Sequence, residues 1–140
     1  MIALTLALKS VFGLTVFMNI FMEGGPLFMT LILICFLISI AFLVMGFSSA
    51  KKVEEKSHKM LKLASDSSLL GLVLGFLGSV LGLITAFDSV EAIGNPDPSI
   101  FAGGLKVSLL TATFGLFTFV VTRVGIIVLR FVLTSEEVSE

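Results

Sequence analysis

Glycine recurs at helical spacing along an apolar stretch near the middle of the chain, and this pattern narrows the possible folds. At about 100° per residue, four glycines and Ser79 fall on one face of a helix, while leucine, valine, isoleucine and phenylalanine cover the remainder. The glycines are Gly71, Gly75, Gly78 and Gly82. A face without side chains lets a second helix approach closely, as is typical of helices in membranes.

A second stretch, residues 103–125, carries a matching face of small and hydroxyl-bearing residues. Gly104, Ser108, Thr111 and Gly115 lie on that face, and Thr113 lies on the other side. In a membrane such faces either pack helices together or line a wet path. Because a hydroxyl in a helix can also donate to the carbonyl one turn earlier, the spacing leaves packing and channel lining open for Ser79, Ser108 and Thr111.

The composition indicates an integral membrane protein. Of 140 residues, 56% are hydrophobic and 14% charged, and the mean hydropathy is +1.14, so the polar residues are too few to cover a water-soluble domain. A net charge of −1 gives no electrostatic basis for nucleic-acid binding. The single cysteine, Cys35, lies in an apolar run, so we expect no disulfide within the chain, and we expect no bound metal or cofactor.

Three segments are predicted to span the membrane. Residues 27–47 carry no charge, and at 1.5 Å per residue they cover a hydrocarbon core of about 30 Å. The lysine-rich connector at 48–66 is expected in the cytoplasm. Residues 67–87 then return outward, and the loop at 88–101 has acidic but no basic residues. A last helix at 102–133 exceeds the core and is predicted to project into the cytoplasm, followed by an acidic tail without a fold of its own.

Residues 1–22 form a separate N-terminal helix in this interpretation, preceding a membrane domain at 23–140. Lys9 and Asn19 interrupt its apolar run, so it spans only if Lys9 extends toward the headgroups. The alternative, slightly favoured, is a helix lying in the interface. A break at 23–26, with two glycines and a proline, separates it from the next helix. The predicted fold class is therefore all-α, a membrane helical bundle of three or four membrane helices.

The two arginines of the last helix, Arg123 and Arg130, are a heptad apart. They are explained as a positive flank on the cytoplasmic side, or as a ring of charge around a cytoplasmic exit.

Two runs together, GFLGSVLGLITAF at 75–87 and AGGLKVSLLTATFGL at 102–116, resemble the proton-channel family that includes MotA, TolQ and ExbB. EGGPLFM at 23–29 looks like the entry to the first spanning helix in the TolQ and ExbB branch. Ser79 matches a family threonine position. The corresponding threonine of the last helix is replaced by Ala112, for which Thr111 can substitute, and the TolQ and ExbB glutamate of that helix is replaced by Val107.

The resemblance implies a homo-pentamer around a single-span partner of the ExbD, TolR or MotB type, whose membrane aspartate carries the proton. It implies a non-enzymatic proton-channel subunit in the bacterial inner membrane that passes the proton motive force to an envelope process such as protein transport. The short connector disfavours a flagellar role. The alternative is a non-conducting scaffold of the same fold. The candidate residues are Ser79, Ser108 and Thr111 for the channel lining, Gly71, Gly75, Gly78, Gly82, Gly104 and Gly115 for helix packing, and Arg123 and Arg130 for the cytoplasmic exit.

Overall fold

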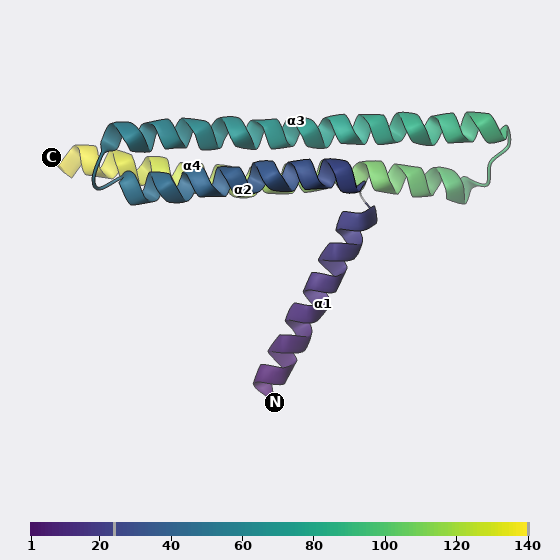
Figure 1. Ribbon diagram of the computed structural model, residues 1–140, viewed down its shortest axis with the longest axis horizontal. Helices are drawn as coiled ribbons and strands as arrows, with labels where there is room; N and C mark the ends of the chain where they lie inside the picture. Colours follow the sequence, from purple (N-terminus) through teal and green to yellow (C-terminus); the bar gives the residue numbers. More distant parts are fainter. Residues whose placement is uncertain (24, 140) are drawn as a thin grey trace.

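The computed structural model describes residues 1–23 and 25–139, and these form four helices (Figure 1). The helices are α1 (Ile2–Glu23), α2 (Pro26–Ser49), α3 (Glu54–Ile93) and α4 (Pro98–Ser139). Each is long and apolar enough to cross a membrane. The described residues contain no strand, which confirms the predicted all-α membrane bundle.

Three of the helices form the bundle. The long helices α3 and α4 run antiparallel along each other, and α2 packs against both (Figure 1). A cluster of buried apolar side chains joins the three helices near the turn between α2 and α3; its members are Leu43, Ala50, Leu61, Ala64, Ile126, Leu129 and Leu133. Beside it, Ser57 of α3 is fully buried and donates a 2.9 Å hydrogen bond to the carbonyl of Gly46 in α2. The cluster of buried apolar side chains therefore lies at this end of the bundle.

The helix ends follow the local sequence. Pro26 and Pro98 open α2 and α4, where proline has no hydrogen bond to lose. Gly94 ends α3 with φ of 78°, a conformation that suits glycine because it lacks a Cβ. The short connection between α3 and α4 covers residues 94–97, within the predicted loop at 88–101. Of the predicted break at 23–26, Gly24 lies outside the described residues.

Helices α3 and α4 are both longer than the spans predicted from sequence. Helix α3 has 40 residues and α4 has 42, about 60 Å each at 1.5 Å per residue, so both extend well beyond a hydrocarbon core of about 30 Å. The predicted connector at 48–66 and outer loop at 88–101 are therefore largely helical.

The expectation that the acidic tail has no fold is wrong as far as residue 139. Helix α4 continues to Ser139 because no glycine or proline follows Gly125 and Leu133 is buried in the core cluster. The Ser135 hydroxyl also donates to the carbonyl of Phe131 within this helix. The last residue, Glu140, lies outside the described part.

Helix α1 leaves the bundle at a steep angle and meets it only near its own C-terminal end (Figure 1). Every side chain described in α1 is exposed. Its contacts with α4 include a 2.7 Å ion pair from Lys106 Nζ to Glu23 Oε2, and an aromatic contact between Phe17 and Phe114 with ring centroids 6.0 Å apart. Its length and composition suit a span, and the interfacial placement stays the competing prediction.

Cysteine labelling in intact cells tests the topology. In a Cys35→Ala background, we expect Lys59→Cys, on an exposed position near the start of α3, to resist a membrane-impermeant thiol reagent because lysine-rich segments stay in the cytoplasm. Ser89→Cys, exposed near the opposite end of α3, should react. The reverse pattern would contradict the orientation. Labelling of Thr5→Cys tests whether α1 spans the membrane. If Thr5→Cys reacts, the chain has three spans, and if it does not react, the chain has four.

Candidate functional site

The small faces of α3 and α4 meet each other inside one subunit. A Cβ built on Gly75 would lie 2.9 Å from the Cα of Gly115, and one built on Gly115 would lie 3.0 Å from the Cα of Gly75. Side-chain carbon atoms do not approach backbone this closely, so the two helices are in backbone contact at this point. Only glycine at both positions permits that separation.

The other candidate packing glycines extend this contact in two directions. A Cβ on Gly82 would lie 2.9 Å from the Ser108 hydroxyl, and one on Gly104 would lie 2.5 Å from the Cβ of Ala86, so both belong to the contact between α3 and α4. Gly71 and Gly78 instead face α2: a Cβ built on Gly71 would lie 3.2 Å from the Cβ of Cys35, and one built on Gly78 would lie 2.7 Å from the Cγ of Phe28. The single face expected on the first glycine helix thus serves two neighbouring helices.

The three candidate channel hydroxyls lie close to one level of the bundle. Ser79 is four residues after Gly75, and Thr111 is four residues before Gly115, so the antiparallel register places them at the same height. Ser108 lies one turn further toward the outer loop, opposite Gly82. Two of the three are enclosed: Ser108 is 2% and Thr111 3% exposed. Ser79 is half-buried and so is the one reachable from outside the subunit.

The enclosed hydroxyls differ in their hydrogen bonds. Thr111 donates to the carbonyl of Val107 at 3.2 Å, the usual way in which a helix satisfies such a group. The Ser108 Oγ is buried and has no hydrogen-bond partner among the described residues. An unsatisfied hydroxyl in an apolar environment is costly, so Ser108 marks a place where a water molecule or another polar group would be stabilised.

The spacing left helix packing and channel lining open for these hydroxyls. In the structure Ser108 and Thr111 point into the interface between α3 and α4 of the same chain. The reason is the glycine contact, which turns the small faces toward each other. Ser79 lies at the edge of that contact and keeps an open side.

The two arginines of α4 lie in different environments. The guanidinium of Arg123 lies over the ring of Phe119, 4.7 Å from its centroid, and its Nε is buried with no acceptor among the described residues. Arg130 is exposed. Leu129, next to Arg130, belongs to the core cluster near the turn between α2 and α3, so the two arginines lie toward the end of the bundle that carries the lysine-rich turn.

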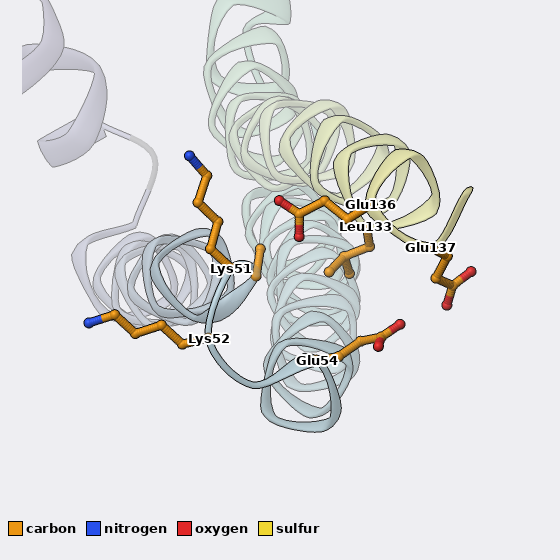
Figure 2. Close-up of a pocket in the computed structure, with 7 residues that line it drawn as sticks. Lys51, Lys52, Glu54, Leu133, Glu136 and Glu137 are labelled. Atoms are coloured by element: carbon orange, nitrogen blue, oxygen red, sulfur yellow. The ribbon is translucent and has the colours of Figure 1, made fainter. Parts of the chain in front are cut away.

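A polar pocket of about 200 Å³ lies at that same end, between the turn after α2, the start of α3 and the end of α4 (Figure 2). Its lining residues are Ala50, Lys51, Lys52, Glu54, Leu133, Glu136 and Glu137. Beside it, His58 Nε2 lies 4.0 Å from Glu54 and 3.9 Å from Glu137. These three exposed side chains bring ligand atoms within 4.8 Å of one another, and exposed groups of this kind are common without a bound ion.

Sequence reasoning missed the contacts that tie the chain ends to the bundle. The spacing of Glu54 and His58, one helical turn, was a signal for their pairing, but Glu137 was assigned to a tail without structure. The ion pair from Lys106 to Glu23 joins residues 83 positions apart, and no local pattern indicates it.

The fold and the site define the class of the protein: a multi-pass membrane protein whose long helices are joined through glycine contacts. The model of the MotA/TolQ/ExbB proton channel family matches residues 45–136. The chain belongs to this family. The match covers α3 and most of α4, the two helices that carry the small faces, and the family implies a proton-channel-like role. It does not distinguish the TolQ and ExbB branch. Comparisons with curated proteins and with solved structures found no match.

Two glycines of α4 provide a matched test of the backbone contact. A methyl group at position 115 would lie 3.0 Å from the Gly75 Cα, whereas one at position 103 would meet no atom within 4 Å. We expect Gly115→Ala to lower the unfolding free energy by about 1–3 kcal/mol, as overpacking does, and Gly103→Ala to leave it nearly unchanged. Thermal unfolding of the detergent-purified protein measures the difference. Equal midpoints for the two variants would contradict the contact.

Proposed function

We propose that this chain is the proton-channel subunit of a bacterial inner-membrane complex that converts the proton motive force into mechanical work on the cell envelope, as TolQ and ExbB do. It would act as a homo-oligomer, with a pentamer expected, around a single-span partner of the ExbD, TolR or MotB type. Membership of the proton-channel family supports the channel role. The EGGPLFM entry to α2 supports the TolQ and ExbB branch.

The distribution of acidic residues supports a partner. No aspartate or glutamate occurs within 27–47, 67–87 or 102–133, so a proton carrier at membrane depth has to come from another chain. A protonatable acid at that depth needs polar groups that bear no charge of their own, because a fixed charge would be costly there. Hydroxyls can both accept and donate a hydrogen bond, and so can solvate such an acid in either protonation state.

The observation that carries the proposal is the placement of Ser79. It is the half-buried member of the three hydroxyls, level with Thr111 and one turn from the unsatisfied Ser108. A partner helix passing the open side of the contact between α3 and α4 would meet Ser79 first, with the two enclosed hydroxyls behind it. Arg123 and Arg130 would then lie toward the cytoplasmic exit.

A second function, a non-conducting scaffold of the same fold, is favoured by the enclosure of Ser108 and Thr111. Thr111 satisfies its own hydroxyl within the helix, as a residue that serves only packing would. The two functions predict different results when hydroxyls are removed and the complex still assembles. A channel loses proton flux, whereas a scaffold has no flux that depends on the hydroxyls.

Proton flux in proteoliposomes that contain the subunit and its single-span partner tests the channel role. We expect the double variant Ser79→Ala, Thr111→Val to assemble with the partner but to lose most of the flux reported by a pH-sensitive dye, because it retains the approximate volumes and deletes two hydroxyls.

The control is Thr113→Val. Thr113 donates to Leu109 at 2.8 Å much as Thr111 donates to Val107, but it is exposed on the other side of α4. Its variant should leave flux nearly intact. Equal loss from Thr113→Val would show that the wrong face was assigned, and full flux in the double variant would favour the scaffold.

A further inference from the structure

Arg123 is a charged side chain that one subunit leaves incompletely satisfied. Its Nε is buried without an acceptor and its guanidinium is held over Phe119. No described carboxylate forms an ion pair with it: the ion pairs of the described residues involve Lys106 and His58. A buried donor on a cation is among the most costly groups to leave unpaired. The residue as a whole is only half-buried, so the rest of its guanidinium can reach an anionic group outside the subunit.

An acidic residue of matching depth is present on the same chain. The register between α3 and α4 is fixed where Gly75 faces Gly115 and Gly82 faces Ser108. Eight residues before Gly75 is Ser67, and eight residues after Gly115 is Arg123, so these two lie at one height. Asp66 is one residue from Ser67, a difference of about 1.5 Å along the helix axis.

Asp66 cannot serve Arg123 of its own subunit. It lies two residues from each of the buried Ala64 and Ser68, and at 100° per residue it therefore points away from the packed face of α3. It is exposed and forms no ion pair among the described residues. One subunit thus carries an unpaired acid and an incompletely satisfied base at the same depth but on different sides.

We propose that Arg123 of one subunit forms an ion pair with Asp66 of the neighbouring copy, at the cytoplasmic end of the spans. The inference rests on the proposed homo-oligomer. When copies are related by rotation about an axis along the membrane normal, every residue keeps its depth, so groups at one height on different sides of a subunit can meet across an interface. A head-to-tail interface of this kind needs two complementary surfaces, and Asp66 and Arg123 supply one charge to each.

The pair assigns separate roles to the two arginines. Arg123 becomes part of the seam between subunits, where partial burial strengthens an ion pair relative to one in water. Arg130, which is exposed, is left to set the potential of the cytoplasmic exit.

Crosslinking between differently tagged copies tests the pair directly. One copy carries Asp66→Cys and the other Arg123→Cys, both in a Cys35→Ala background, and the two are co-expressed and oxidised in membranes. We expect a disulfide-linked heterodimer that contains both tags. Each variant expressed alone should yield no dimer, because in a ring of more than two subunits a residue does not meet its own copy. Dimers from Asp66→Cys alone, or no heterodimer from the mixture, would overturn the proposal.

Charge reversal provides a second, independent readout. Asp66→Arg or Arg123→Asp should lower the ratio of oligomer to free subunit in native mass spectrometry by about tenfold or more, the scale of coupling between close charges at an interface. The double reversal should restore the ratio. Glu91→Arg, at the far end of α3, is the control and should change little. If Arg123 instead binds a lipid phosphate, Asp66→Arg will have no effect, which would refute the pair.

These measurements do not depend on proton movement. A crosslinked ring without flux would support the pair and contradict the channel. Proton flux through an assembled complex that forms no crosslink would support the channel and contradict the pair.

Discussion

The backbone contact between Gly75 and Gly115 is the constraint on which the rest of the structure depends. A Cβ built on either glycine would lie only about 3 Å from the backbone of the other helix, so any larger residue would push α3 and α4 apart. In lipid, where apolar side chains gain little by leaving a solvent that is itself apolar, close backbone packing is a main source of helix association. The contact fixes the register of the two longest helices, and through it the relative heights of the polar groups on α3 and α4.

The same contact explains why the hydroxyls divide into an enclosed and an accessible group. Glycine and serine faces that meet each other bury Ser108 and Thr111, while Ser79 at the edge stays half-buried. A polar site built in this way needs no charge within the membrane, which suits a chain that has no acid in its predicted spans. The cost is one unsatisfied hydroxyl, that of Ser108, which is buried between α3 and α4.

Glycine spacing and hydropathy predicted the membrane class, the small faces of α3 and α4 and the helix start at Pro26. They did not predict what each small face contacts, because helical spacing gives a direction but not a neighbour: Gly71 and Gly78 turned out to face α2. The extent of α3 and α4 was also underestimated. Charged residues such as Lys59 and Glu137 end a hydrophobic span without ending a helix, so hydropathy marks the membrane and not the secondary structure. Contacts between distant segments, such as Lys106 with Glu23, have no local signal.

In the proposed function, the Ser79 side of α3 borders a hydrated path while the opposite side does not. Accessibility to a small hydrophilic thiol reagent in the assembled complex tests it, with Ser79→Cys compared with Leu81→Cys in a Cys35→Ala background. The two positions lie about 200° apart on one helix and differ in depth by about 3 Å. We expect Ser79→Cys to react, and Leu81→Cys, although more exposed on the isolated subunit, to stay unmodified. Modification of Leu81→Cys with protection of Ser79→Cys would contradict it.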